Sequence, residues 1–116
     1  MDFDSLTVVL LLRRDEAPEL DDEAADALQD AHLDYLASLH EAGHLVAAGP
    51  VGGERIRGLS LLRVDVDEAR RLKEQDPAVR AGVYELEVLP WRFPAGAMSF
   101  HRTRFPHSLA EATSAS

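Results

Sequence analysis

One histidine and one aspartate stand out in this chain as residues that could carry acid–base chemistry. His32 lies between Leu28 and Leu36 on the apolar side of a helical repeat, and a titratable ring in such a place has to be paired or lie in a pocket. Asp76 comes directly before Pro77, where an aspartate usually caps a helix or forms a turn. The spacing leaves two interpretations open: a pair that moves protons, or a core histidine bonded to a backbone carbonyl and a separate turn aspartate.

A zinc-binding motif is matched letter by letter at residues 40–44, which read His-Glu-Ala-Gly-His. The H-E-x-x-H site requires both histidines on one face of a continuous helix, with a third ligand later in the chain. Gly43 is instead typical of a helix end, which places His44 in the next connection. We therefore predict a chance match, with His40 and Glu41 near solvent and no metal site.

A glycine-rich stretch occupies residues 49–53, but no Gly-Lys-Ser or Gly-Lys-Thr follows it and no helix opens there. The stretch therefore predicts a turn and not a phosphate-binding loop. The chain has no cysteine, which excludes a thiol nucleophile and a thiolate zinc site. We expect a protein that needs no metal and no cofactor.

Four segments carry the apolar or alternating pattern of strands, and two carry the period of helices. The predicted strands are residues 6–12, 45–51, 58–66 and 83–89. The predicted helices are residues 19–42 and a shorter helix that is capped by Asp67 and ends before Asp76. This order predicts an α+β fold, a ferredoxin-like βαββαβ arrangement with a four-stranded antiparallel sheet and two helices on one face.

The predicted sheet leaves one face without helices of its own. Residues 6–12 are apolar on both faces of their strand, so something must cover the bare face. We predict a homodimer in which two sheets pack face to face. The C-terminal segment could cover part of that face instead.

The segment after the predicted domain of residues 1–93 is a C-terminal extension, residues 94–116. Its apolar residues Met98, Phe100 and Phe105 should dock on the domain or the partner and help wall a pocket. Arg102 or Arg104 would then be available to attract an acidic ligand. Alternatively, the extension shields an edge strand. Residues 110–116 are expected to fray.

Composition excludes several classes of protein. The chain has 116 residues and a net charge of −9, which fits one domain and argues against a nucleic-acid partner, since such proteins present basic patches. No basic stretch precedes the apolar run of residues 6–12, and that run is too short to span a bilayer. We expect a cytoplasmic protein that does not bind membranes.

Four segments, in this order, resemble the YCII-related (YciI-like) family. The segment Ala-His-Leu-Asp-Tyr-Leu at 31–36 is similar to the family's His-Leu-x-x-Leu helix. Residues 41–50 resemble its Gly-x-Leu-x-x-x-Gly-Pro turn into the second strand. Residues 76–84 resemble its Asp-Pro-x-x-x-x-Gly block, and residues 89–91 its strand that ends in proline and an aromatic residue.

The resemblance implies a dimeric α+β barrel whose proposed active site pairs a histidine with an aspartate, here His32 and Asp76. At least one family type is a dehydrochlorinase, so the resemblance implies a small-molecule lyase or isomerase. His32 would move the proton and Asp76 would orient the ring and stabilise imidazolium. The alternative is a non-catalytic ligand-binding or accessory protein of the same fold.

The sequence also predicts the residues of a substrate pocket, and two of its positions differ from the family pattern. The expected pocket residues are Tyr35, Gly49, Pro50, Trp91 and Arg102. The chain carries Ala78 where the family often has an aromatic residue, and Gln29 where it often has an arginine. Both differences change the wall of the pocket, so the resemblance does not identify the substrate.

Overall fold

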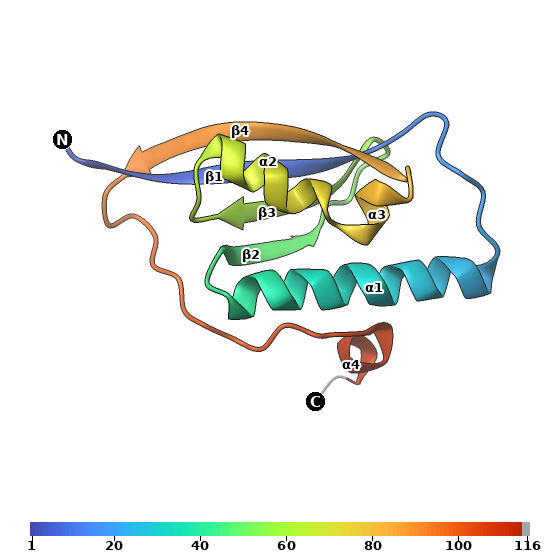
Figure 1. Cartoon of the computed structure of the whole chain (residues 1–116). Coiled ribbons are helices and arrows are strands. Elements are labelled where there is room, and N and C mark those ends of the chain that lie inside the picture. The colour runs from blue at the N-terminus through green and yellow to red at the C-terminus, as the bar shows by residue number, and fades with distance from the viewer. Residues whose placement is uncertain (115–116) are drawn as a thin grey trace.

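A computed structural model describes residues 1–114 of the chain. In chain order its elements are β1 (Phe3–Arg13), α1 (Asp22–Glu41), β2 (Leu45–Pro50), β3 (Ile56–Leu62), α2 (Val66–Glu74), α3 (Pro77–Arg80), β4 (Tyr84–Pro94) and α4 (Leu109–Thr113). The strands form one antiparallel sheet in the order β2-β3-β1-β4. Helices α1, α2 and α3 lie on one face of it (Figure 1). The predicted α+β, ferredoxin-like fold is confirmed.

Several predicted boundaries were wrong. β4 continues to Pro94 because it pairs with β1 along its whole length, up to the pair Phe3↔Pro94. As an edge strand, β4 tolerates prolines that a central strand would not. The domain boundary predicted after residue 93 therefore falls inside a strand. The N-cap of α2 is Asp65, whose carboxylate accepts from the Glu68 amide at 2.8 Å, and Asp67 lies in the first turn.

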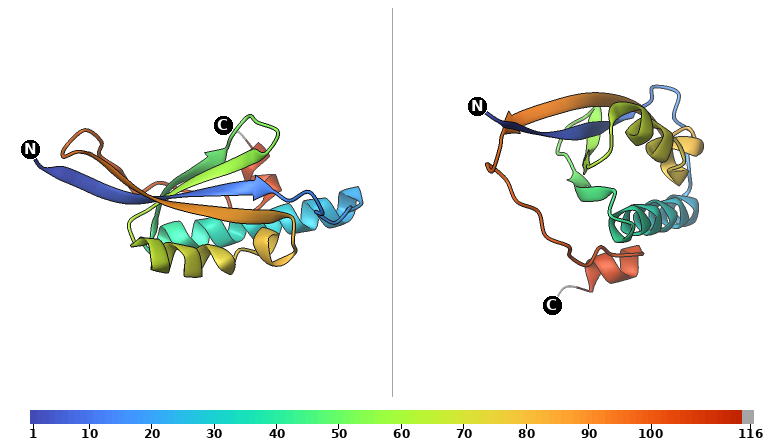
Figure 2. Two further views of the ribbon diagram at one scale, coloured as in Figure 1. Left: turned by 90° about the horizontal axis from the view of Figure 1, so that it is seen from above. Right: turned by 60° about the vertical axis from the view of Figure 1, so that its left-hand side comes forward.

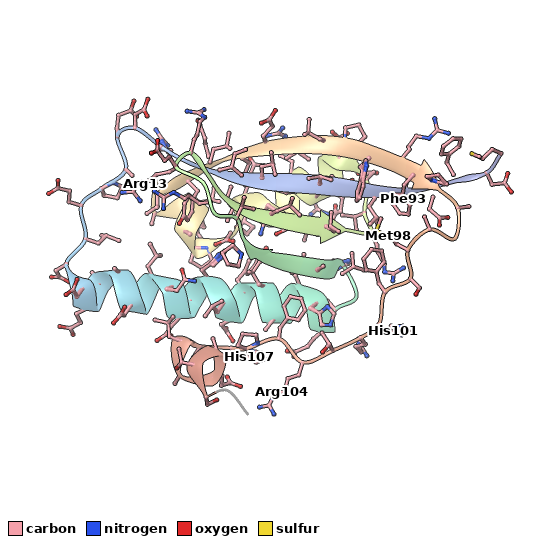
Figure 3. All side chains as sticks on the ribbon, turned by 180° about the vertical axis from the view of Figure 1, so that it is seen from behind. Arg13, Phe93, Met98, His101, Arg104 and His107 are labelled. Carbon is pink, nitrogen blue, oxygen red and sulfur yellow. The ribbon has the colours of Figure 1, made fainter. Side chains whose placement is uncertain are left out.

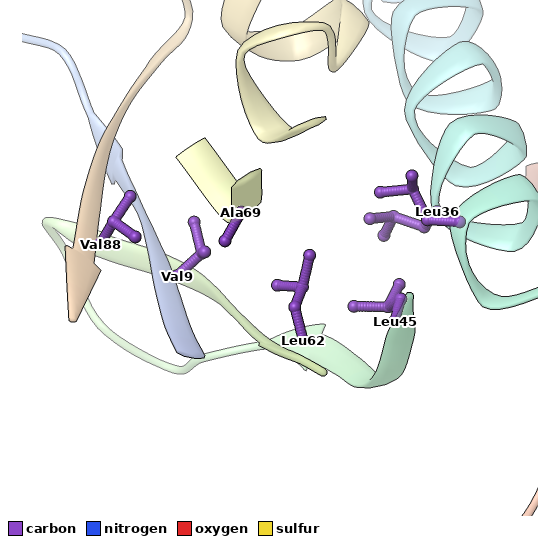
Figure 4. Close-up of a cluster of buried hydrophobic side chains, with 7 residues drawn as sticks. Val9, Leu36, Leu45, Leu62, Ala69 and Val88 are labelled. Atoms are coloured by element: carbon purple, nitrogen blue, oxygen red, sulfur yellow. The ribbon is translucent and has the colours of Figure 1, made fainter. Parts of the chain in front are cut away.

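The main core lies between the sheet and the helices. α1 presents Leu36 and Leu39 toward the sheet, in keeping with their helical spacing. Figure 4 shows that Leu36 faces side chains from all four strands and from α2. The strand and α2 members of this core are Val9, Leu45, Leu62, Val88 and Ala69. Each fully buried leucine or valine contributes roughly 1.5–3 kcal/mol relative to an exposed one.

The C-terminal segment covers part of the opposite sheet face. Met98 and Phe100 pack against the buried side chains of Leu6, Val46 and Phe93. The chain then runs back past α1 and ends in α4, which lies beside α1 (Figures 1 and 2). Residues 109–113 form a helix where fraying was expected, because Ser108 caps it. Residues 115–116 lie outside the described part.

Within residues 1–114, none of the helices combines the length and the apolar character that crossing a bilayer requires.

Candidate functional site

His32 and Asp76 are in direct contact, although 44 positions separate them. The Nδ1 atom of His32, near the middle of α1, lies 2.9 Å from Oδ1 and 2.8 Å from Oδ2 of Asp76. The Asp76 side chain is fully buried, and that of His32 is 11% exposed. The packing of α3 against α1 brings the two residues together.

Asp76 has a second structural role that follows from its place before proline. It is the N-cap of α3, and its Oδ1 accepts from the Ala78 amide at 2.9 Å. Pro77 begins the helix, where its missing N–H is not needed. Asp76 is therefore a helix cap and also a hydrogen-bond partner of His32.

Lys73 is a third charged member of the site, and sequence reasoning missed it. Its Nζ atom lies 3.5 Å from Oδ2 of Asp76 and 3.3 Å from Oγ of Ser60, and its side chain is fully buried. A buried ammonium group is tolerated only when it is paired. A signal was present, because Lys73 is the only lysine of the chain and precedes Asp76 by three positions on a predicted helix.

The cluster shifts the pKa values of Asp76 and Lys73. Burial is the largest single influence on Asp76 and pushes the pKa of its carboxyl upward. The hydrogen bond and charge of His32, the charge of Lys73 and the Ala78 amide together outweigh burial, so the pKa of Asp76 is lowered. Burial lowers the pKa of Lys73 against the attraction of Asp76. Asp76 is therefore a carboxylate at neutral pH.

A cavity of about 360 Å³ opens beside His32. Among the described residues, no hydrogen-bond partner is found for the second ring nitrogen of His32, Nε2, on this open side. The walls are mostly apolar and come from α1, the sheet and the C-terminal segment. Besides His32, the residues that line the cavity include Leu11, Gln29, Arg57, Gly58, Ser60, Tyr84, Phe105 and Pro106.

The pocket residues expected from the sequence divide into two groups. Gly49 and Pro50 line the cavity. Tyr35 does not, because its hydroxyl donates to the Leu72 carbonyl behind the site and burial raises the pKa of this phenol. Its ring packs against the main core.

Trp91 and Arg102 lie away from this cavity. Antiparallel pairing places Tyr84, at one end of β4, beside the cavity, and Trp91 at the other end, where it pairs with Leu6 and contacts Phe93. Arg102 donates to the Glu41 carbonyl at 2.6 Å. Arg104 pairs with Glu111 and does not line the cavity either. The cation that does line it is Arg57.

His40, the first residue of the H-E-x-x-H match, was predicted to lie near solvent. This prediction was wrong, because His40 is buried. Its Nδ1 donates to the Leu45 carbonyl at 2.7 Å, and its Nε2 accepts from the Thr103 amide at 3.0 Å. The Phe105 ring stacks on it with centroids 4.1 Å apart. Both nitrogens are thus engaged. Residues 1–114 contain no group of three or more His, Asp or Glu side chains that could hold a metal ion.

The segment that carries Phe105 is anchored to α1 at several points. His107 lies between two carboxylates of α1, with Nδ1 2.6 Å from Asp34 and Nε2 2.7 Å from Glu41. The Leu109 amide donates to the Asp30 carboxylate at 2.7 Å. Figure 3 shows His107 between α1 and α4. These contacts hold Phe105 and Pro106 over the cavity.

Several solved structures have a similar fold, and one of them matches this chain over most of its own length. It is 5-chloro-2-hydroxyhydroquinone dehydrochlorinase (TftG) from Burkholderia phenoliruptrix AC1100, in complex with 2,5-dihydroxybenzoquinone. The TM-score is 0.57 at 21% sequence identity, and the match covers 74% of this chain and 92% of that chain. At this identity the likeness shows a shared fold. No curated protein sequence matches the chain.

The family comparison agrees with the motifs. The YCII-related domain matches residues 7–92, a span that includes His32, Lys73 and Asp76 and ends before the C-terminal segment. The match confirms the resemblance predicted from the ordered motifs: this chain belongs to the YCII-related family.

Proposed function

We propose that this protein is a small-molecule enzyme of the lyase or isomerase type that works by acid–base catalysis at His32. One observation carries the proposal: the imidazole is bonded through Nδ1 to a buried carboxylate, while its other side opens on a cavity. The catalytic residues would be His32 and Asp76. The fold shared with a dehydrochlorinase supports a lyase-type reaction.

The proposed roles follow from the geometry. The Asp76 carboxylate accepts the Nδ1 proton, so the lone pair of the neutral ring lies on Nε2 and can take a proton from a ligand in the cavity. The imidazolium that results is stabilised by the adjacent carboxylate. In an elimination, the same ring would then return the proton to solvent or to product.

The second candidate is a non-catalytic protein that holds a small ligand. The cavity favours it in one respect, because most of its lining is apolar and such walls suit binding without reaction. Phe105 and Pro106 also lie beyond the matched residues 7–92. This part of the cavity belongs to the C-terminal segment, so the ligand of a relative does not transfer to this chain.

Turnover separates the two candidates. Chlorinated hydroquinones would be supplied as substrates and chloride release measured, with 2,5-dihydroxybenzoquinone binding followed by thermal shift. We expect chloride release in the wild type and its loss in His32→Gln. His101→Gln is the matched control, since His101 is exposed and outside the cavity. Binding without turnover favours the accessory protein, and equal turnover in His32→Gln would contradict the proposal.

We also propose a homodimer that forms through the open sheet face. Leu59, Leu89 and Trp91 are between 36% and 41% exposed, and Leu89 and Trp91 lie on the face opposite the helices. Light scattering at micromolar concentration should give a dimer, and Leu89→Glu should give a monomer. Leu20→Glu is the control, since Leu20 is also 41% exposed but precedes α1. A monomeric wild type would remove this proposal.

The lack of cysteine fits a cytoplasmic location.

A further inference from the structure

Ser60 is a polar residue on the otherwise apolar sheet floor of the cavity. It sits in the middle of β3, paired with Val9 of β1 on one side and with Ala48 of β2 on the other. Its side chain is on the helix side of the sheet, where Val9 joins the main core. Ser60 is only 3% exposed, yet it lines the same cavity as His32.

The hydroxyl of Ser60 is held from behind by Lys73. The ammonium group donates to Oγ at 3.3 Å, which occupies a lone pair of the hydroxyl and leaves its own proton to be donated. Among residues 1–114, no acceptor is found for that proton. A hydroxyl that accepts a bond from a cation becomes a stronger donor, because hydrogen bonds in a chain polarise one another.

The charges around the cavity favour an anion. Its lining includes the cation Arg57 but no aspartate or glutamate, in a chain whose net charge is −9. The buried carboxylate of Asp76 is shared by His32 and Lys73, so its charge is largely neutralised within the cluster. A positive cavity on an acidic protein selects small anions from solution.

Gly58 lies beside Ser60 on the floor of the cavity, where the Leu11 side chain packs against its backbone. The two residues are two positions apart on β3 and therefore lie on the same face of the sheet. A Cβ at position 58 would come within 3.2 Å of Cδ1 of Leu11. The lack of a side chain at position 58 therefore makes room for Leu11, which forms the apolar wall of the cavity next to Ser60.

We infer that Ser60, held by Lys73, is the group of this site that binds an anionic oxygen, and that the ligand is a small enolate or phenolate. The inference rests on the proposed function of His32. In the corresponding step, the ligand's C–H bond breaks and the proton goes to Nε2 of His32. The electron pair of that bond forms a C=C bond to the adjacent carbonyl carbon, and the C=O π pair becomes a lone pair on the enolate oxygen. That oxygen accepts the Ser60 proton as a hydrogen bond, as in an oxyanion hole.

Binding of phenols tests this assignment without any turnover. 4-Nitrophenol and phenol would be titrated at a pH between their pKa values, where the first is an anion and the second is neutral, with 4-nitroanisole as a neutral probe whose oxygen is blocked by a methyl group. We expect the wild type to prefer 4-nitrophenolate. Ser60→Ala should weaken that binding about tenfold, as for a lost hydrogen bond to a charged group. It should leave 4-nitroanisole binding unchanged.

The control is Ser38→Ala, since the Ser38 hydroxyl bonds to the Asp34 carbonyl on α1 and lies outside the cavity. Lys73→Met, if it folds, should weaken 4-nitrophenolate binding in the same direction. Equal losses for phenolate and anisole in Ser60→Ala, or no loss for either, would overturn the assignment. So would a wild type that binds no phenolate. The chloride-release test of His32 is independent of these outcomes, so failure here leaves the proposed acid–base function standing.

Discussion

His32 on α1 and His107 on the C-terminal segment beside α1 both pair with carboxylates at nearly the same distances, but one pair is buried and the other is exposed. His32 meets Asp76 at 2.8 Å, and His107 meets Asp34 at 2.6 Å and Glu41 at 2.7 Å. The Asp76 side chain is fully buried, whereas those of Asp34 and Glu41 are 62% and 60% exposed. Water and salt screen the exposed contacts of His107, whereas the buried contact between His32 and Asp76 is screened much less.

The two clusters also differ in what the imidazole must do. Both nitrogens of His107 face carboxylates, so this ring satisfies both bonds only when it is doubly protonated. Only one nitrogen of His32 faces a carboxylate, and the other side of the ring opens on the cavity. A histidine–carboxylate contact therefore does not by itself identify a reactive site. The buried partner and the open cavity make the difference.

The largest effect is expected from breaking the buried cluster. Asp76→Asn removes the charge that holds Lys73, and leaves a fully buried ammonium group without a counter-ion. Such a change typically costs about 3–5 kcal/mol of unfolding free energy. Urea denaturation should show this loss, and Lys73→Met in the Asp76→Asn background should recover part of it. A double variant less stable than Asp76→Asn would contradict the pairing.

Acid provides an independent measure of the same cluster. The pKa of Asp76 is lowered in the folded state, so its contribution to stability is present above the ordinary value of 3.8 and is lost as pH falls through the lower folded value. The wild type should thus lose stability below pH 3.8 more steeply than Asp76→Asn. Parallel curves would mean that Asp76 is not held as a carboxylate.

Much of the buried cluster could be predicted, because its signals are local. An apolar helix face marks His32 and the Asp-Pro step marks Asp76, but these patterns left a structural role open for both residues, and their pairing was implied by the resemblance to the YCII-related family. Lys73 could not be predicted as buried, since lysine on a short helix usually points to solvent. Its position depends on how α2 lies over Ser60. Trp91 was expected in the pocket because the last strand was predicted to end at residue 89. β4 continues past that residue, and Trp91 pairs with Leu6 instead.

The exposed cluster was not predicted at all, because its residues come from α1 and from a segment without clear period. The sequence indicated that Phe105 would dock, but not what would hold it. The anchor is His107, between Asp34 and Glu41, and its own amide bonds to the Glu111 carboxylate at 3.1 Å. Contacts of this kind depend on the final placement of side chains, which local sequence patterns do not encode.

The smallest effect is expected from the exposed cluster, and it should depend on pH. The hydrogen bonds to Asp34 and then to Glu41 raise the pKa of His107 above its ordinary 6.5. A raised folded pKa gives a contribution that is fully present below pH 6.5 and is lost as pH rises through the folded value. Asp34 and Glu41 on α1 and Glu111 on α4 are the acidic groups around the ring. The anchor should therefore loosen on the alkaline side.

Limited trypsin digestion after Arg104 reports this loosening, since that side chain is 87% exposed and adjoins Phe105. The ratio of wild-type to His107→Gln cleavage rates removes the pH dependence of trypsin itself. We expect the ratio to be below one at acid pH and to approach one above pH 6.5. In high salt the ratio should approach one at a lower pH, because salt screens exposed contacts. Global stability should change far less in His107→Gln than in Asp76→Asn. A ratio that is constant with pH would show that His107 does not hold the segment by its charge, and the contrast between the two histidines would then lie in the cavity alone.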